Sequence, residues 1–217
     1  MKRSAIRDTS CNGICRMSDG RALLRARMAV RRDELDAKQR IAAAAGLLHS
    51  LEALPEFMTD ANVAGYWAVR GELPLNLAVA SLARREQHYF LPVLGAMRQL
   101  YFAEYSTGTP ITHNRFGIPE PALPADQRLA PREMDVILLP LLAFDRQGHR
   151  LGTGGGWYDS SLAFLRDAAR PATPLLVGIG YAFQETESIS AEPWDIDLDY
   201  VATDSELIAC GPVDATA

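Results

Sequence analysis

The sequence has few cysteines, no long hydrophobic run and no excess of positive charge. Its three cysteines form no CxxC pair, which argues against a disulfide framework and against a zinc site. No segment reaches about eighteen uninterrupted apolar residues, and residues 1–20 lack the apolar core of a secretory signal. The net charge of −5 and the pI near 5.4 argue against a nucleic-acid surface held by overall basicity. We therefore expect a cytoplasmic protein with neither membrane nor nucleic-acid partners.

The length of 217 residues, with 48% hydrophobic residues, suits one domain with one sizeable core. Residues 1–18 lack periodicity, so we expect a disordered extension there and a single domain over residues 19–217, ending in a loose tail. A helical pattern starts at Asp19. A second helix is expected to open at Asp36, where Gln39 completes a capping box, and to stop near Pro55.

Runs rich in β-branched and aromatic residues alternate with helical stretches such as 74–86 and 157–169. These runs lie at 63–67, 88–93, 100–105, 136–142, 175–181 and 200–202. The alternation predicts an α/β fold, a single three-layer Rossmann-like domain with a mostly parallel sheet and helices on both faces. Residues 106–134 contain many prolines and are expected to form a long ordered loop. Ligands of such sheets bind beyond the carboxyl ends of the strands.

The run FDRQGHRLGTGGGWYD, residues 144–159, follows the apolar strand candidate 136–142 and has four glycines in five positions. Such a backbone can curl round an anion with its N–H groups inward, although a glycine-rich loop is also common as a surface turn. The flanking residues favour a phosphate cradle. Arg150 offers a cation and Asp159 a hard oxygen for Mg²⁺, while the Trp-Tyr pair before Asp159 offers a flat wall.

This block resembles the signature of the 5-formyltetrahydrofolate cyclo-ligase family, also called methenyltetrahydrofolate synthetases. Bacterial members read close to AFD-x-x-G-x-RLG-x-GGG-[FY]-YD. The resemblance runs from about Arg21 to about Thr203 and includes further motifs in the same order. These are Arg21-x-x-x-Arg25, Tyr66-Trp67-x-x-x-Gly71-Glu72, Phe90-Leu91-Pro92-Val93, Phe116-Gly117-Ile118-Pro119-Glu120-Pro121 and Pro193-Trp194-Asp195.

The resemblance implies an enzyme that closes 5-formyltetrahydrofolate to 5,10-methenyltetrahydrofolate, with ATP as co-substrate and Mg²⁺ as cofactor. ATP phosphorylates the formyl oxygen, the amine at position 10 attacks, and ADP and phosphate are released. Phosphoryl transfer of this kind requires positioning and charge stabilisation rather than a protein nucleophile. Small-molecule substrates are the expected partners, with no obligatory protein partner.

The resemblance also implies which residues carry each role. ATP is bound by Arg21, Arg25, Arg150, Leu151, Gly152, Thr153, Gly154, Gly155, Gly156, Trp157 and Tyr158. The folate is bound by Trp67, Glu72, Phe116 and Trp157. The metal is bound by Asp159 and Asp195, and catalysis involves Arg150, Glu72 and Tyr158. Without the resemblance, these residues also have ordinary structural interpretations. Arg21 and Arg25 fit a solvated helix face, and Glu72 fits an acid favoured at a helix N-terminus. Trp67 fits a core residue, and Asp195 fits a turn residue.

The sequence also fits two other functions. Animal members of the family carry arginine and lysine where this chain has Thr153 and Gly155, so a catalytically silent folate- or nucleotide-binding protein of the same fold is an alternative. Retention of Glu72, Arg150 and Asp159 favours the active enzyme. The sheet-and-helix pattern by itself also fits a sugar-phosphate isomerase or a CoA-transferase-like enzyme, but fold analogy is poor evidence for function.

Overall fold

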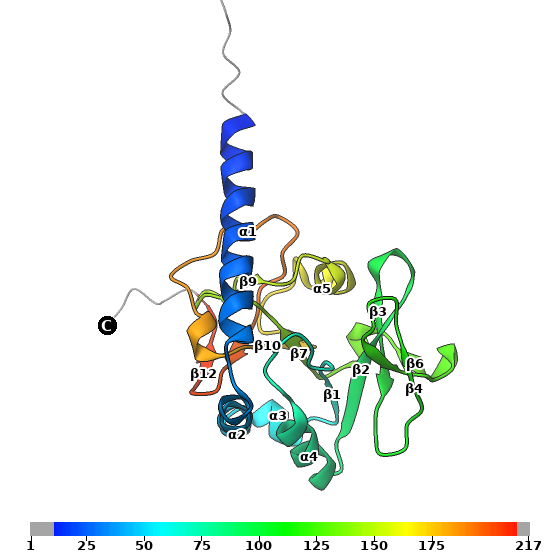
Figure 1. Cartoon of the computed structure of the whole chain (residues 1–217). Helices are drawn as coiled ribbons and strands as arrows, with labels where there is room; N and C mark the ends of the chain where they lie inside the picture. Colours follow the sequence, from blue (N-terminus) through cyan, green and yellow to red (C-terminus); the bar gives the residue numbers. More distant parts are fainter. Residues whose placement is uncertain (1–10, 212–217) are drawn as a thin grey trace, which may run out of the picture.

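The computed structural model describes the backbone of residues 11–211 and the side chains of residues 20–211. Its α-helices are α1 (Cys11–Asp33), α2 (Ala37–Glu52), α3 (Pro55–Thr59), α4 (Asn76–Arg84) and α5 (Trp157–Ser161). The 3₁₀ turns are η1 (Ala96–Arg98), η2 (Ala125–Gln127), η3 (Pro131–Glu133), η4 (Ala163–Leu165) and η5 (Ala182–Gln184). The strands are β1 (Asn62–Ala64), β2 (His88–Leu94), β3 (Leu100–Glu104), β4 (Ile111–His113), β5 (Pro119–Pro121), β6 (Arg128–Leu129), β7 (Val136–Pro140), β8 (Ala143–Phe144), β9 (Arg150–Leu151), β10 (Leu175–Ile179), β11 (Tyr200–Ala202) and β12 (Leu207–Ala209) (Figure 1).

Eight strands form one sheet in the order β12-β11-β10-β7-β1-β2-β3-β6. The five inner strands from β11 to β2 are parallel, whereas β12, β3 and β6 pair antiparallel with their neighbours toward the two edges. The expected α/β fold with a mostly parallel sheet is confirmed. Because β1 and β7 are adjacent and parallel, the chain leaves both strands at the same end of the sheet.

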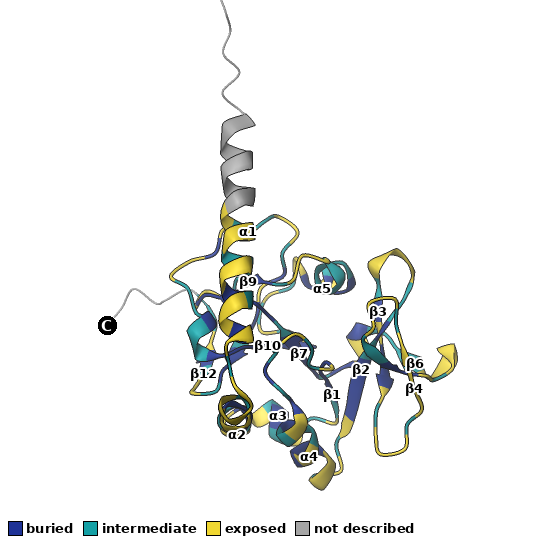
Figure 2. Ribbon diagram, in the orientation of Figure 1, coloured by how far each residue is buried: buried dark blue, intermediate teal, exposed yellow. Residues whose placement is uncertain are grey.

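Hydrophobic side chains on both faces of the sheet form the core. In β7, Val136 and Leu138 pack in the cluster that includes residues of α2, α3 and α4. Ile137 and Leu139 belong to the opposite cluster, which includes residues of η4. This division follows from the two-residue period of a strand. Figure 2 shows the central strands as buried and the exposed residues on the outer sides of the helices. The three-layer arrangement agrees with the prediction.

Helix α2 begins where the capping box predicts. The N–H of Gln39 donates to Asp36 Oδ1 at 2.8 Å, and the N–H of Asp36 donates to Gln39 Oε1 at 2.9 Å. Two N–H groups that would lack partners at the start of the helix are thus satisfied reciprocally.

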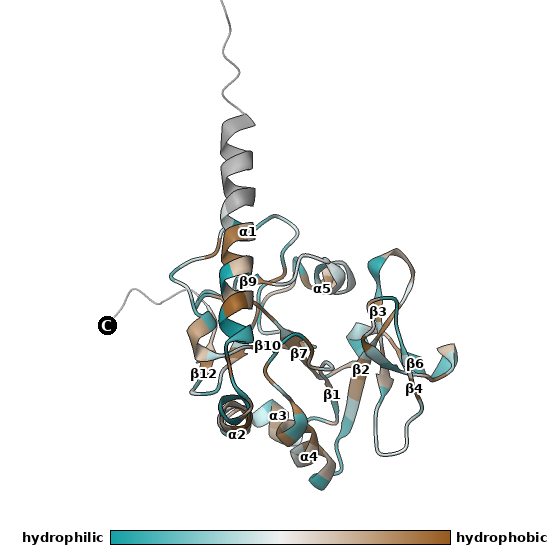
Figure 3. Ribbon diagram, viewed as in Figure 1, coloured by the Kyte–Doolittle hydropathy of each residue, from teal (hydrophilic) through white to brown (hydrophobic). Residues whose placement is uncertain are grey.

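Helix α1 begins at Cys11, so the backbone of residues 11–18 is helical where an irregular extension was expected. Once a helix has formed, adding a residue to its end costs little free energy, so the helix can extend through residues whose sequence has no helical periodicity. Figure 3 shows hydrophobic and polar residues alternating along the coloured part of α1. Residues 1–10 and 212–217, with the expected tail, lie outside the described residues. None of the helices described has the length and hydropathy to cross a membrane.

Two further segments differ from the expectation. Residues 106–134 contain the hairpin β4–β5 and the strand β6 rather than a loop alone. The prolines of β5 concealed it, since proline lacks a ladder donor and is tolerated mainly in edge positions. The helix expected over 157–169 ends at Ser161. There Ser161 Oγ donates to the carbonyl of Trp157 at 2.7 Å, and Leu162 leaves the helical region with φ −101° and ψ 8°.

A short hairpin, β8–β9, separates β7 from the glycine-rich segment. Its turn is organised by Asp145, which is fully buried and accepts hydrogen bonds from the N–H groups of His149 and Ile189. The N–H of Leu142 donates to the carbonyl of Leu151 at 2.7 Å, so the hairpin closes back on the end of β7. The glycine-rich segment therefore starts close to the edge from which β7 leaves the sheet.

Candidate active site

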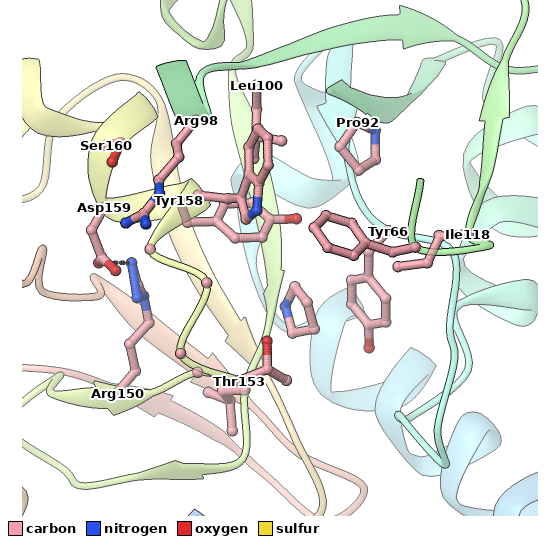
Figure 4. Close-up of a pocket in the computed structure, with 18 of the residues that line it drawn as sticks. Tyr66, Pro92, Arg98, Leu100, Ile118, Arg150, Thr153, Tyr158, Asp159 and Ser160 are labelled. Atoms are coloured by element: carbon pink, nitrogen blue, oxygen red, sulfur yellow. Dashed lines mark hydrogen bonds and ion pairs between the residues drawn. The ribbon is translucent and has the colours of Figure 1, made fainter. Parts of the chain in front are cut away.

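A cavity of about 840 Å³ is lined by residues that follow β1 and β7, together with residues of α1, the β2–β3 loop and the β4–β5 segment (Figure 4). The predicted site residues that line it are Arg21, Arg25, Trp67, Glu72, Phe116, Arg150, Gly152, Thr153, Gly154, Gly155, Gly156, Trp157, Tyr158, Asp159 and Asp195. Leu151 is the exception. Its side chain is fully buried and packs with Met28 and Leu142, because it points from β9 into the core.

The glycine-rich segment, residues 152–156, has a backbone that only glycine adopts without strain at two positions. Gly154 has φ +93° and Gly156 has φ +66°. The N–H groups of residues 152–156 donate no hydrogen bond to any residue in the described part of the chain. These donors are free for an anion, as the cradle hypothesis requires.

Arg150 and Asp159 form an ion pair beside this segment. Arg150 Nη2 donates to Asp159 Oδ1 at 2.6 Å, with side-chain exposures of 6% and 22%. The pair brings together the charged residues that flank the glycine-rich segment on either side, as Figure 4 shows. Asp159 Oδ2 accepts no hydrogen bond from the residues described, so one carboxylate oxygen is available to a further ligand.

The arginines of α1 line the same cavity. Arg25 Nε donates to the carbonyl of Gly152 at 3.0 Å. Arg21 Nη1 donates to Asp195 Oδ2 at 2.9 Å and to the carbonyl of Ser190 at 2.7 Å. Burial, reinforced by the charge of Arg21, lowers the pKa of Arg25, and Asp195 opposes this shift. The side chains of Arg21 and Asp195 are both largely buried, at 14% and 12% exposure.

Aromatic rings form the other half of the cavity. The rings of Phe116 and Trp157 meet edge to face with centroids 6.3 Å apart, and the Arg115 guanidinium lies over both rings. Trp67 meets Tyr105 in a similar T-shaped contact at 5.7 Å. Phe116 is half-exposed and Trp67 is 37% exposed, so both present ring surface to a ligand. Trp67 is therefore not a core residue.

Glu72 and Tyr158 lie between the two halves. Glu72 Oε2 accepts a hydrogen bond from the N–H of Val69 at 3.0 Å, while burial raises the pKa of its carboxyl. Burial, and then the nearby Glu72 carboxylate, raise the pKa of Tyr158 far above its usual value, against the effect of Arg150. The phenol of Tyr158 therefore stays protonated at neutral pH, and a protonated phenol can donate a hydrogen bond to a ligand.

Sequence reasoning missed Glu120, which also lines the cavity. It is only 7% exposed, and its Oε1 accepts hydrogen bonds from the N–H of Leu94 at 3.0 Å and from Asn114 Nδ2 at 2.8 Å. Oε2 accepts none from the described residues. The sequence feature that could have indicated Glu120 is an acid between two prolines, but this feature by itself is typical of a loop. Arg98 of the β2–β3 loop was missed as well, because no motif surrounds it.

The sequence pattern of the 5-formyltetrahydrofolate cyclo-ligase family matches residues 17–204. The chain belongs to the 5-formyltetrahydrofolate cyclo-ligase family. A cyclo-ligase of Haemophilus influenzae is 36% identical over 139 residues, which cover 63% of this chain and 72% of the relative. The Escherichia coli K12 cyclo-ligase is 33% identical over 156 residues, which cover 70% of this chain and 83% of the relative. The structure of Aquifex aeolicus 5,10-methenyltetrahydrofolate synthetase superposes with a TM-score of 0.75 at 27% identity and covers 91% and 95% of the two chains.

These similarities confirm the predicted family and the predicted enzyme class, a ligase. They argue against a sugar-phosphate isomerase or a CoA-transferase-like enzyme. The residue roles implied by the resemblance stay predictions. No group of three or more histidine, cysteine, aspartate or glutamate side chains that could hold a metal occurs in the described part of the chain. The described residues can therefore offer a metal ion at most a pair of such ligands at one place, and Mg²⁺ commonly takes its other ligands from phosphate oxygens and water.

Proposed function

We propose that this cyclo-ligase converts 5-formyltetrahydrofolate and ATP into 5,10-methenyltetrahydrofolate, ADP and phosphate. The terminal phosphoryl group of ATP passes to the formyl oxygen, which leaves ADP. The amine at position 10 then attacks the formyl carbon and loses its proton, and the C–O bond breaks with release of phosphate. The first step makes a poor leaving group into a good one, so no protein nucleophile is needed.

The glycine block is the proposed site of the phosphate chain. Free N–H groups of residues 152–156 can donate to phosphate oxygens, and Arg150 can neutralise the charge that develops during transfer. Arg25, which is bonded to the carbonyl of Gly152, borders this cradle from α1. Arg21 supports the same side through its ion pair with Asp195.

Asp159 and Asp195 are the proposed protein ligands of Mg²⁺. Each has one carboxylate oxygen that accepts no hydrogen bond from the described residues, and both line the cavity. Mg²⁺ is satisfied by one or two carboxylates with phosphate oxygens and water, so this pair fits the ion. When bound, the ion would neutralise phosphate charge during the transfer.

The aromatic half is the proposed folate site. Trp67, Phe116 and Trp157 present ring edges and faces to the planar rings of the substrate. Glu72 accepts hydrogen bonds from substrate N–H groups, and Tyr158 donates one at the junction between the folate and the phosphates. The partly desolvated carboxylate of Glu72 binds such donors more strongly than a solvated one would.

The observation that carries this proposal is the meeting of both halves in one cavity. The decisive experiment follows the absorbance of the methenyl product with 5-formyltetrahydrofolate, with and without ATP and Mg²⁺. We expect product only when all components are present. Binding of both substrates without product would favour the catalytically silent alternative. A cytoplasmic location and the lack of an obligatory protein partner stay predictions.

A further inference from the structure

The loop between β2 and β3 carries an arginine to the edge of the glycine-rich segment. Arg98 lines the cavity, and a Cβ atom on Gly156 would lie 3.8 Å from Arg98 Nη1. Figure 4 shows the Arg98 side chain directed toward the Arg150–Asp159 pair. This position is on the phosphate side of the cavity, far along the sequence from the glycine block.

The loop holds Arg98 in an unfavourable backbone conformation. Met97 and Arg98 both have left-handed backbones, with φ +50° and +59°. A left-handed backbone at a residue other than glycine costs free energy, and it is kept only where contacts with the surrounding structure hold it in place. Packing of Met97 does not explain the strain, because its side chain is 89% exposed.

Hydrogen bonds to α5 hold the loop in place. The N–H of Leu100 donates to Ser161 Oγ at 2.7 Å, and Gln99 Nε2 donates to the carbonyl of Ser160 at 3.3 Å. Helix α5 follows the glycine-rich segment directly. The loop and the glycine-rich segment are therefore joined through the same short helix, and this junction keeps Arg98 beside Gly156.

The charges around the cradle show why an additional cation matters. Arg150 and Arg21 are each paired with an aspartate, and Arg25 donates to a carbonyl. The Arg98 guanidinium makes no hydrogen bond or ion pair with the residues that the structure describes. Within the glycine-rich segment itself, residues 153 and 155 are Thr and Gly and carry no charge.

We propose that Arg98 binds the phosphate chain of the nucleotide. It supplies from the β2–β3 loop a positive charge that the glycine-rich segment lacks. The proposal rests on the proposed function, because it takes the glycine-rich segment as the phosphate site. A guanidinium suits this role, since its fork of N–H donors matches two phosphate oxygens and its charge does not depend on pH.

The test compares Arg98→Gln and Arg98→Lys with the unmodified protein. Calorimetric titration with MgATP, without folate, should show roughly tenfold weaker binding for Arg98→Gln, the loss expected when a charge-assisted hydrogen bond is removed. The MgATP affinity of Arg98→Lys should lie between those of Arg98→Gln and the unmodified protein, because lysine keeps the charge but lacks the forked pair of N–H donors. In turnover assays the KM for ATP should rise while the KM for 5-formyltetrahydrofolate is unchanged.

Two controls separate this role from loop folding and from general electrostatics. Met97→Gln alters the same strained loop without removing charge, and Arg84→Gln removes one exposed positive charge at the end of α4. Both should bind MgATP normally. Unchanged MgATP affinity in Arg98→Gln, or a rise in the folate KM alone, would overturn the proposal. Lack of turnover in the unmodified protein would instead refute the proposed function, and the MgATP titration would still test Arg98.

Discussion

The two halves of the cavity are built on different principles. The proposed phosphate half is mainly backbone and charge: free N–H groups of residues 152–156, the ion pair of Arg150 with Asp159, and the arginines of α1. The proposed folate half is mainly side-chain surface, with aromatic rings from the β1 exit and from the β4–β5 segment. Glu72, which is partly buried, lies at the junction of the two halves.

This difference matters for how each half tolerates change. A backbone cradle depends on conformation, so its contacts survive many side-chain substitutions, and its vulnerable points are single charges such as Arg150. The aromatic half distributes binding over several rings, so the loss of one ring removes one part of the contact area. The following experiments test the comparison, beginning with the largest expected effect.

Arg150→Met should produce the largest loss, in nucleotide use. Each charge-assisted hydrogen bond to phosphate contributes about 1.5–3 kcal/mol, so kcat/KM for ATP should fall roughly tenfold to a hundredfold. Methionine keeps part of the volume of a side chain that is only 6% exposed. The control is Arg146→Ala, which removes exposed ion pairs with Glu185 and Glu206 nearby and should leave turnover intact. Normal ATP kinetics in Arg150→Met would remove Arg150 from the phosphate site.

Glu72→Gln should impair the folate half selectively. The substitution keeps the shape and the oxygen that accepts from the N–H of Val69, but it removes the charge. We expect kcat/KM for 5-formyltetrahydrofolate to fall by about tenfold, the loss of one hydrogen bond to a charged group, with ATP affinity retained. Glu104→Gln, on the exposed side of β3, is the matched control. Equal losses for both substrates would mean that Glu72 supports the cavity without belonging to one half.

Asp159→Asn and Asp195→Asn should have a smaller effect, on the metal requirement. Each removes one charged oxygen ligand, and phosphate oxygens and water provide the rest of the coordination. The Mg²⁺ concentration for half-maximal rate should rise several-fold for Asp159→Asn, because Asp159 lies at the end of the proposed phosphate site, and less for Asp195→Asn, which lies on a separate loop; both aspartates are paired with an arginine. A Mg²⁺ titration of turnover at fixed ATP measures both. Curves that superimpose on the unmodified protein would refute the metal assignment.

The smallest expected effect is on stability, and Glu72→Gln should increase it at neutral pH. Burial raises the folded-state pKa of Glu72 above its ordinary value of 4.5, so the ionised carboxylate carries a desolvation cost in the folded protein. Well below pH 4.5 the carboxyl is neutral in both the folded and the unfolded state, and the variant should match the unmodified protein. As the pH rises through the folded-state pKa, the variant should gain relative stability. Denaturant unfolding at several pH values measures this, and a variant that is less stable at neutral pH would contradict it.

Much of the phosphate half was predictable from sequence because it is nearly contiguous. Glycines at fixed spacing, Arg150 and Asp159 lie within ten residues, so local chemistry exposes the cradle. Arg21 and Arg25, which line the cavity, were predicted as site residues only through the family resemblance, since a charged helix face alone indicates solvent. Leu151 shows the limit of a motif: a residue inside it can serve the core, as the alternation of a strand dictates.

The sequence by itself determined the strand–helix alternation, the capping box of α2 and the glycine block, because each depends on residues that are neighbours along the chain. Only the tertiary structure decided that Glu120 faces the cavity and that Arg98 lies beside Gly156. Both depend on how the β2–β3 loop and the β4–β5 hairpin pack against distant elements. Such contacts arise from sheet order and loop anchoring, which residues that are neighbours along the chain do not specify.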